Sequence, residues 1–422
     1  MHILLVGCTG YLGKAMIYWF ITHTKHHLYV AIRPKNGLTI RERLFNIFTE
    51  LNLSPTERII PIQTSYDDTR QIIMAQEDKE RIYQDADIII NALADVKFNR
   101  PLRKAVLNNT VTALNWMKFF KNCIKGRKYI YVSSALINFH ITNNGTIQEK
   151  IYETRMNETT LIKILGGEKT DIKPYANTYL YSKQLSEILL LQRKEYLSLA
   201  LFRPSGICPA VEFPYCGWGA MQTLNYIFFG IGTGMIPYWN ISKESVMSNN
   251  MNIVPVDIAA RDCISMIRTK QPFEIRHSCF TGNNPFCITY FTFFLYTHEA
   301  YRYYKQHPLS LGNHIFKPHY PFYLKDHNTI YLLILFIYHL QDRFTSRKDF
   351  FHFLQMLKIS FKLTRNLNKY LPRFVSKKII FKRKNKRKWF YKDYPMDKSY
   401  RNFIENLDYT IKNDPSLIKL FS

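Results

Sequence analysis

GCTGYLG, residues 7–13, is the stretch that decides the fold of this chain. The apolar run HILLVG leads into it from residue 2 and has the pattern of a buried parallel strand. After it, KAMIYWFITHT (14–24) carries apolar residues at helical spacing, and HLYVAIR (27–33) has the pattern of a second strand. A strand, a glycine turn, a helix and a second strand form the unit in which such a turn binds a dinucleotide.

Each glycine of this G-x-x-G-x-x-G turn has a separate expected task. Gly7 lets the chain turn sharply, Gly10 lets backbone amides approach a pyrophosphate, and Gly13 allows the helix to pack closely on the sheet. The helix N-terminus adds partial positive charge near the phosphates. A purely structural turn is the alternative. The turn residues expected to contact a cofactor are Gly7, Thr9, Gly10, Tyr11, Leu12 and Gly13.

Two cations follow the second strand. A site that prefers NAD usually has an acid there for the ribose hydroxyls, whereas this chain has Arg33-Pro34-Lys35. Arg33 and Lys35 suit the 2′-phosphate of NADP. A pair of solvated surface charges is the alternative.

Further apolar runs follow at the intervals of an α/β protein. They are RIIPIQ (58–63), DIIINALA (87–94), KYIYVSSA (128–135) and LALFRPS (199–205), with an amphipathic stretch at 100–123. This alternation predicts an α/β fold with a doubly wound, Rossmann-type parallel sheet. The fourth strand ends in the small residues NALA, so Ala92 is expected beside the adenosine half of a cofactor.

A tyrosine and a lysine four residues apart form the expected catalytic pair. Tyr179 and Lys183, in TYLYSKQLSE, share one face of a predicted helix. A nearby ammonium lowers the pKa of a phenol, so Tyr179 is expected to act as a general acid at neutral pH. Ser134, at the end of YIYVSS, is the expected donor that holds a reacting carbonyl oxygen.

The bulk composition narrows the classes of partner. The chain has 422 residues, 46% of them hydrophobic, which is enough for two domains or one large domain with an appendage. Its net charge of +26 favours anionic partners, namely nucleic acid, acidic lipid or a phosphorylated ligand. Seven scattered cysteines without a C-x-x-C pair argue against a disulfide framework or a zinc site and favour a reducing compartment. His23, His26 and His27 have no acid or cysteine beside them, so no metal is expected.

Several stretches resemble the fatty acyl-CoA reductases, within the extended short-chain dehydrogenase/reductase superfamily. They are GCTGYLGK, AIRPKNGLTIRERL, ERIIPIQ, ADVKFNRPLRKAVLNN, YVSSALIN, NTYLYSKQLSE, FRPSGICPAVEFPYCGW and NIVPVDIAARD, and they cover most of residues 2–285 in the family's order. The glycine turn and the Y-x-x-x-K pair support only the superfamily. VKFNRPLR, EFPYCGW and VPVD favour the narrower family.

By position, the resemblance implies a role for each candidate catalytic residue. Tyr179 would be the proton donor, Lys183 would bind the nicotinamide ribose and tune Tyr179, and Ser134 would orient the carbonyl. Asn109 matches a helix asparagine that often completes a proton relay in this superfamily. The neighbouring Asn108, or an ordinary polar helix position for Asn109, is the alternative.

The implied reaction is the reduction of a long-chain fatty acyl-CoA by NADPH to a primary alcohol, through the aldehyde and with release of CoA. One alternative is an extended short-chain dehydrogenase that acts on another lipid such as a sterol. The other is a degenerate relative that binds NADP without turnover. This last alternative rests on a departure from the family, whose members carry a Gly-Asp pair for the adenine where this chain has Gln63-Thr64-Ser65-Tyr66.

The chain is expected to divide at residue 291. Residues 1–291 form the predicted NADP-binding reductase domain with its substrate segments, and residues 292–422 a basic, aromatic-rich, mostly helical domain. The apolar stretches at 286–296 and 330–338 fall short of the ~20 residues that span a bilayer. KKIIFKRKNKRKWFYK (377–392) has nine Lys or Arg and no acid, which suits an anionic membrane surface. A solvated basic face is the alternative, and nucleic acid is disfavoured because the rest of the chain indicates a lipid substrate.

These features also predict a location. We expect a cytosol-facing membrane, of the endoplasmic reticulum or the peroxisome, and otherwise the cytoplasm. The sequence does not indicate an oligomeric state.

Overall fold

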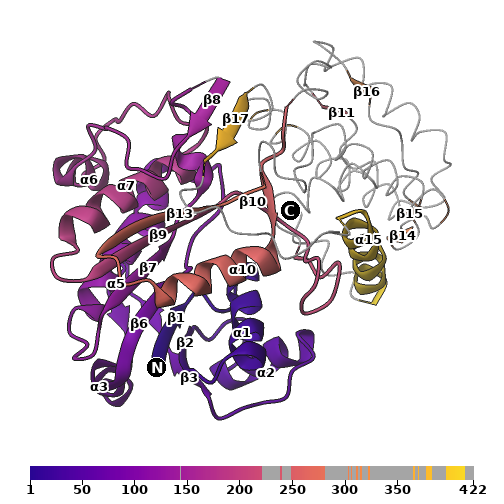
Figure 1. The fold of residues 1–422 in the computed structure, drawn as a ribbon, viewed down its shortest axis with the longest axis horizontal. Helices are drawn as coiled ribbons and strands as arrows, with labels where there is room; N and C mark the ends of the chain where they lie inside the picture. Colours follow the sequence, from indigo (N-terminus) through magenta and orange to yellow (C-terminus); the bar gives the residue numbers. More distant parts are fainter. Residues whose placement is uncertain are drawn as a thin grey trace, which may run out of the picture.

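In the computed structural model, a seven-stranded parallel sheet forms the core of the N-terminal part of the chain (Figure 1). The structure describes residues 1–142, 144–220, 249–280, 377–382 and 396–413, together with isolated positions between 238 and 369. The strand order is β13-β9-β7-β6-β1-β2-β3. The bounds are β1 (His2–Val6), β2 (His27–Ile32), β3 (Ile59–Gln63), β6 (Ala86–Asn91), β7 (Lys128–Val132), β9 (Ser198–Pro204) and β13 (Phe273–Ser278).

Helices cover both faces of the sheet (Figure 1). Buried residues of α1 (Tyr11–His23), α2 (Ile40–Glu50) and α10 (Val256–Ser265) share one core cluster. Those of α3 (Gln76–Asp85), α5 (Thr112–Phe120), α6 (Glu158–Leu165) and α7 (Thr178–Arg193) share the other. Alternate residues of β1 divide between the two, Ile3 and Leu5 facing α1, and Leu4 and Val6 facing the opposite layer. The predicted doubly wound, Rossmann-type sheet is therefore confirmed.

The order of the strands reverses at β1. From β1 the chain passes outward to β2 and β3, and it then returns to the other side of β1 to build β6, β7, β9 and β13. In open α/β sheets a ligand binds beyond the carboxyl ends of the strands at such a switch point. The glycine turn follows β1 at this point.

The six predicted strands each lie within a few residues of an observed one, but β13 was not predicted. Its sequence, FEIRHS, alternates Glu274 and Arg276 with apolar residues because the strand lies at the edge of the sheet. The predicted amphipathic helix at 100–123 is observed as α4 (Leu102–Val106), the π-helical turn η1 (Leu107–Val111) and α5. A π turn inside a helix is rare and frequently lies at a functional site.

Local capping fixes where two important segments begin. The side chain of Asn177 accepts a hydrogen bond from the Leu180 amide at 2.9 Å and so begins α7. Ser134 caps the short 3₁₀ helix η2 (Ala135–Asn138) after β7. The smaller elements are β4 (Ser65–Tyr66), β5 (Ile72–Ile73), β10 (Gly206–Cys208), β11 (Tyr238–Trp239), β12 (Ile253–Pro255), β14 (Ser310–Leu311), β15 (His314–Ile315), β16 (Phe322–Tyr323) and η3 (Met266–Arg268).

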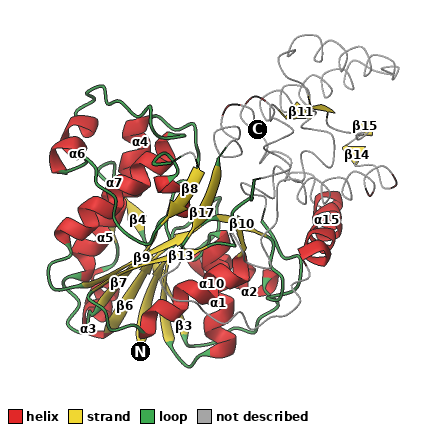
Figure 2. Cartoon of the chain, turned by 45° about the horizontal axis from the view of Figure 1, so that its top comes forward, coloured by secondary structure: helices red, strands yellow, loops and turns green. Residues whose placement is uncertain are grey.

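Two segments from the C-terminal part of the chain contact residues outside the seven strands of the main sheet (Figure 2). Strand β17 (Lys378–Phe381) pairs in parallel with β8 (Asn144–Ile147). In the first turn of helix α15 (Met396–Asn413), the Ser399 hydroxyl donates to the Ala210 carbonyl at 2.6 Å. The predicted division at 291, the apolar stretches at 286–296 and 330–338, and the basic residues 383–392 lie outside the described residues. No helix within the described part of the chain is both long and apolar enough to cross a bilayer.

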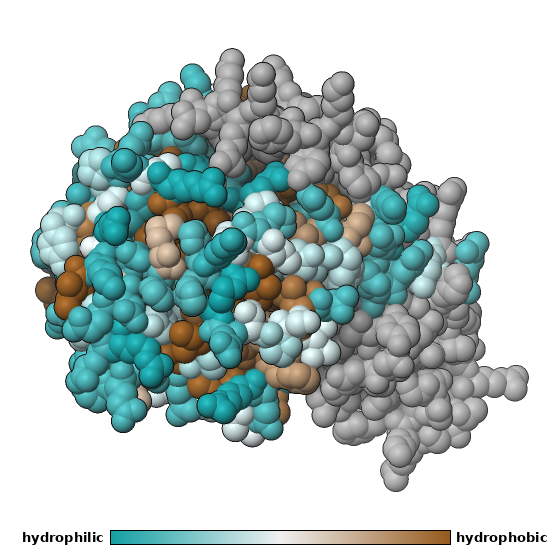
Figure 3. Space-filling model, turned by 60° about the horizontal axis from the view of Figure 1, so that its bottom comes forward, coloured by the Kyte–Doolittle hydropathy of each residue, from teal (hydrophilic) through white to brown (hydrophobic). Residues whose placement is uncertain are grey.

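The described surface is mostly hydrophilic. Figure 3 shows one face on which small apolar patches are scattered among polar side chains. The exposed large apolar residues come from several unrelated elements, among them Phe45, Ile124, Ile162 and Tyr196. Such scattered exposure is ordinary for a folded protein and does not by itself indicate a docking surface.

Candidate active site

The glycine turn follows β1 and packs against the residues that follow β6. Gly7 has φ +87°, and a Cβ atom there would lie 2.6 Å from the backbone carbon of Ala92. A Cβ atom on Gly13 would lie 2.3 Å from the Gly7 carbonyl oxygen, so α1 packs against the turn with no room for a side chain. At Gly10, the nearest described atom would be the Gly7 oxygen at 3.3 Å. The protein backbone thus leaves no room for a side chain at Gly7 and Gly13, whereas the space beside Gly10 is more open.

A pocket lies beside this turn. The residues that line it are Val6, Gly7, Thr9, Ala31, Arg33, Lys35, Arg43, Thr64, Tyr66 and Leu93. Three are cations and none is an acid. Arg33 and Lys35 were predicted here. Arg43, which reaches the pocket from α2 and donates to the Arg33 carbonyl, was missed, because no motif ties a residue of α2 to the end of β2.

The pocket also includes the segment that departs from the family pattern. The Arg33 guanidinium lies 5.8 Å from the centre of the Tyr66 ring. The Trp116 indole donates to the Tyr66 hydroxyl at 2.9 Å and holds the ring in place. Thr64 lines the same pocket and is buried. The positions that lack the family's acid therefore still form a pocket wall.

Other predicted cofactor residues have different surroundings. The Tyr11 hydroxyl lies 3.1 Å from the carbonyl oxygens of both Cys208 and Trp218, so its side chain faces the protein. Leu12 is buried in the core. Leu93 lines the pocket in place of the predicted Ala92, whose backbone packs on Gly7.

Tyr179 lies in the first turn of α7, half-buried under a loop. Its ring centre is 5.9 Å from that of Phe98. The hydroxyl of Thr178 donates to the Arg100 carbonyl at 2.8 Å, which ties the same loop to α7. Burial raises the pKa of Tyr179, so the phenol keeps its proton at neutral pH.

Lys183 is buried, with 1% of its surface exposed, and points at strand β7. Its Nζ atom donates to the Tyr131 hydroxyl at 2.9 Å and to the Val132 carbonyl at 2.6 Å. Burial lowers the pKa of Lys183 to about 7. The expectation that Lys183 lowers the pKa of Tyr179 is therefore wrong for the protein alone, because desolvation dominates at both groups and the ammonium faces Tyr131.

Ser134 follows β7 two residues after Val132, so it lies at the strand end that Lys183 contacts. It is buried, and its Oγ atom accepts a hydrogen bond from the Leu136 amide at 3.2 Å. That bond uses a lone pair and leaves the hydroxyl proton to be donated elsewhere. Ser134 and the ammonium of Lys183 thus both lie at the carboxyl end of β7.

Asn109 lies in the π turn η1 and contacts both the loop after β6, at Asp95, and helix α7. Its Oδ1 atom accepts from the Asp95 amide at 2.7 Å, and its Nδ2 atom donates to the Ser182 hydroxyl at 2.9 Å. Asn108 instead donates to the Asp95 carboxylate at 2.9 Å. Asn109 is therefore the one of the two that contacts the helix of Tyr179 and Lys183, and its part in a proton relay stays a prediction.

Solved reductase domains have the same fold. The terminal R domain from the myxalamid PKS-NRPS biosynthetic pathway aligns over 97% of this chain and 91% of that chain, with a TM-score of 0.64 and 14% identity. The reductase domain of a nonribosomal peptide synthetase from Mycobacterium tuberculosis aligns over 96% of this chain and 92% of its own, with a TM-score of 0.56 and 16% identity. At these identities the likeness concerns the fold alone.

Curated relatives are similar in sequence. Fatty acyl-CoA reductase 1 of Mus musculus is 27% identical over 310 residues, which are 68% of this chain and 59% of that protein. Fatty acyl-CoA reductase 8 of Arabidopsis thaliana is 23% identical over 316 residues, 63% of each chain. The chain therefore spans about three fifths of the length of the curated relatives it matches.

A family profile also matches the chain. It covers residues 5–263, which hold the glycine turn, the cationic pocket, Ser134 and the Tyr179–Lys183 pair. This is more than half of the 422 residues. The profile is that of an NAD-binding family described as male sterility protein, and the chain belongs to that family.

Proposed function

We propose that this protein reduces long-chain fatty acyl-CoA to the primary alcohol, through the aldehyde, with NADPH as the reductant and release of CoA. The observation that carries the proposal is one continuous edge of the sheet. On that edge the glycine turn and its cationic pocket lie at the end of β1, and one strand away, across β6, the end of β7 leads into Ser134 and contacts Lys183. The family and its fatty acyl-CoA reductase relatives support the choice of substrate.

The residues of the pocket fit NADP. The turn is closed at Gly7 and Gly13 but open at Gly10, which leaves room for a pyrophosphate above the start of α1. Arg33, Lys35 and Arg43 form a cluster that suits the 2′-phosphate, because guanidinium groups bind phosphate oxygens in a matching geometry.

The departure at residues 63–66 also fits a nucleotide. Tyr66 and the Arg33 guanidinium present a ring face and a planar cation on which an adenine can stack. In this proposal Tyr66 takes over the contact that the family's acid makes, so loss of the acid does not imply a degenerate protein.

The catalytic residues would act on the carbonyl oxygen of the thioester and then of the aldehyde. When bound, NADPH supplies the hydride. The Ser134 hydroxyl donates a hydrogen bond to the carbonyl oxygen, and Tyr179 donates it a proton at the aldehyde step. Burial keeps Tyr179 in its protonated, donating form. Burial also raises the pKa of the Cys8 thiol to about 12, so this cysteine near the pocket is not a nucleophile.

NADPH consumption by the purified protein with palmitoyl-CoA tests the proposal, with the lipid products identified by mass spectrometry. Hexadecanol is the expected product. Tyr179→Phe should reduce the rate by about 100-fold or more, since a general acid contributes 10²–10⁴-fold. Tyr181→Phe is the matched control, because Tyr181 is a buried tyrosine of the same helix. NADPH binding without turnover of palmitoyl-CoA would point to another lipid, such as a sterol, and full activity of Tyr179→Phe would refute the mechanism.

The location is part of the same proposal. A long acyl-CoA chain partitions at membranes, and the basic segment 377–392 would hold the protein on an anionic, cytosol-facing surface. Its described residues include Lys382, which is exposed at the end of β17.

A further inference from the structure

The ammonium of Lys183 is held by strand β7 rather than by its own helix. The Tyr131 hydroxyl and the Val132 carbonyl accept two of its three N–H groups, at 2.9 and 2.6 Å. The Nζ atom also lies 4.2 Å from the centre of the Tyr131 ring. Both side chains are buried, so water does not compete for these contacts.

The charged groups around Lys183 do not replace Tyr131. Glu187, one turn along α7, is the carboxylate whose charge favours the ammonium. It is itself bound by Arg203 on β9, through hydrogen bonds of 2.9 and 2.6 Å. In the part of the chain that the structure describes, the other titratable groups on this side of the sheet include Tyr131 and Tyr179, both neutral phenols. Tyr131 is thus the side chain in direct contact with the ammonium.

We infer that Tyr131 is a positioning residue, which fixes the Lys183 ammonium at the carboxyl end of β7 and keeps it charged. The hydroxyl oxygen accepts a charge-assisted hydrogen bond, and the ring adds a cation–π contact. With two N–H groups held, the third is left for the ribose of a bound nucleotide or for Tyr179. The functional readout rests on the proposed NADPH-dependent activity, whereas the assignment itself rests on the contacts above.

The strand supplies a matched control for this role. Tyr129 lies two residues earlier, on the same face of β7, and is equally buried. Its hydroxyl donates to the Ala113 carbonyl at 2.8 Å and accepts from the Asn91 amide at 2.7 Å. Tyr129→Phe therefore removes a buried, bonded hydroxyl from the same strand without removing an acceptor of Lys183.

The first test is the pH dependence of the NADPH dissociation constant, measured by fluorescence titration. In the wild type, binding should weaken as the pH rises through the Lys183 pKa of about 7, because the ammonium loses its charge. Lys183→Met should lack this step. Tyr131→Phe should move it to lower pH by about one unit, since a hydrogen bond to a charged group contributes roughly that much. Tyr129→Phe should leave it in place.

A second readout needs no ligand. Lys183 binds fewer protons folded than unfolded between about pH 7 and its unfolded pKa of 10.5, so it contributes stability against urea that rises with pH over that range. This contribution is the difference between the wild-type and Lys183→Met profiles, because the buried Lys128 adds a rise of its own. In Tyr131→Phe the contribution should begin about one pH unit lower. Tyr129→Phe should keep the wild-type profile. If the protein turned over no acyl-CoA or bound no NADPH, the proposed function would be refuted. The unfolding profiles would still show whether Tyr131 holds the Lys183 ammonium.

The inference is overturned by any of three results in the unfolding profiles. They are a Tyr131→Phe profile that coincides with the wild type, an equal shift in Tyr129→Phe, and a Lys183→Met profile that rises as steeply as the wild type. In the activity assay, Tyr131→Phe should lower kcat about tenfold near pH 8 with little change in the KM for palmitoyl-CoA. Activity should recover toward lower pH as Lys183 regains its proton.

Discussion

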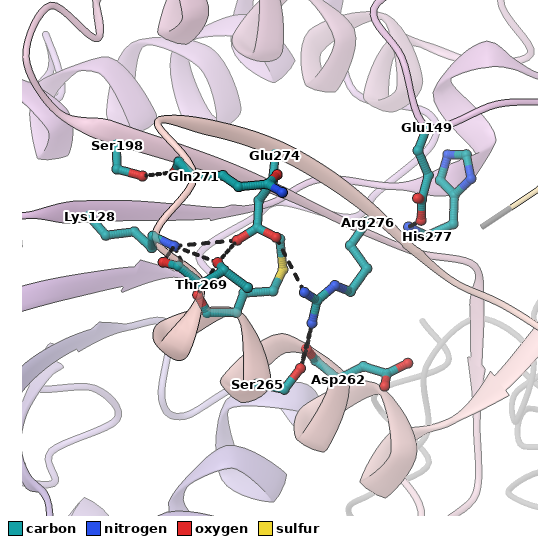
Figure 4. A network of polar contacts seen from close by, with 11 residues as sticks. Lys128, Glu149, Ser198, Asp262, Ser265, Thr269, Gln271, Glu274, Arg276 and His277 are labelled. Carbon is teal, nitrogen blue, oxygen red and sulfur yellow. Dashed lines mark hydrogen bonds and ion pairs between the residues drawn. The ribbon is translucent and has the colours of Figure 1, made fainter. Parts of the chain in front are cut away.

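Two buried lysines at the two ends of strand β7 have opposite surroundings. Lys128 begins the strand at its amino end, and Lys183 contacts its last residue, Val132, at the carboxyl end. Lys128 donates to the carbonyl of Met266 at 3.0 Å and to the hydroxyl and carbonyl of Thr269, and it lies 3.4 Å from the Glu274 carboxylate (Figure 4). Among the described residues, Lys183 has two uncharged acceptors and no carboxylate bonded to its ammonium.

Further charged residues extend the network around Lys128. Glu274 also lies 3.2 Å from Arg276, which donates to the Ser265 hydroxyl and the Asp262 carbonyl (Figure 4). Burial lowers the pKa of Lys128, while the nearby Glu274 carboxylate opposes the shift. Protein groups thus satisfy the cation at the amino end, where it joins β7 to the strand β13 and the turn after α10. At the carboxyl end the cation keeps a donor for a ligand, at the edge where parallel sheets bind ligands.

The largest expected effect is on catalysis at the carboxyl end. Lys183→Met should lower kcat with palmitoyl-CoA by about 100-fold or more, because the proposed mechanism uses the ammonium to stabilise the phenolate left by Tyr179. The free energy of unfolding should stay the same or rise, because replacing a buried cation by an apolar side chain of similar length is often neutral or stabilising. Steady-state kinetics and urea denaturation measure the two quantities. If Lys183→Met lost activity only because less of the protein was folded, Lys183 would be a structural residue like Lys128, and the proposed difference between the two lysines would be wrong.

The next effect is on stability at the amino end. Lys128→Met should lower the free energy of unfolding by roughly 3 kcal/mol, because it removes the ammonium partner of the buried Glu274 carboxylate and a donor to the Thr269 hydroxyl and carbonyl. Arg276 still neutralises Glu274, which keeps the loss near the low end of the usual range for a broken buried pair. The activity per folded molecule should be unchanged. A large fall in kcat for folded Lys128→Met would show that both lysines serve the reaction.

The smallest effect concerns cofactor choice at the cationic pocket. Arg33→Ala should weaken NADPH binding by about 10- to 100-fold and NADH binding by much less, since a charge-assisted hydrogen bond contributes roughly 1.5–3 kcal/mol. Arg41→Ala is the control, because Arg41 is an exposed cation of α2 that does not line the pocket. Fluorescence titration with both nucleotides gives the ratio. Equal losses for NADPH and NADH would mean that Arg33 does not bind the 2′-phosphate.

The amount of structure predictable from sequence differs between these regions for physical reasons. Continuous apolar runs predicted six strands of the sheet, because a strand buried on both faces has no polar position. The edge strand β13 breaks that pattern with Glu274 and Arg276, which take part in the Lys128 network. The glycine turn was predictable because its steric demands act within seven residues of chain.

Contacts that depend on tertiary packing could not be predicted from the sequence. Tyr131 and Lys183 are 52 positions apart, and neither periodicity nor spacing links a strand residue to a helix residue at that distance. Arg43 reaches the pocket only because α2 packs beside the end of β2. The pKa of Tyr179 was predicted in the wrong direction, since adjacency on a helix says nothing about desolvation.

The most direct test of the central claim is the stoichiometry of the reaction. The purified protein would be incubated with palmitoyl-CoA and NADPH carrying deuterium at the transferred position, and the free CoA thiol, the oxidised cofactor and the lipid would be measured together. We predict two NADPH oxidised for each CoA released, and hexadecanol with two deuterium atoms on its hydroxyl-bearing carbon. CoA release without deuterium in the lipid, or NADPH oxidation without CoA release, would contradict the proposed reduction.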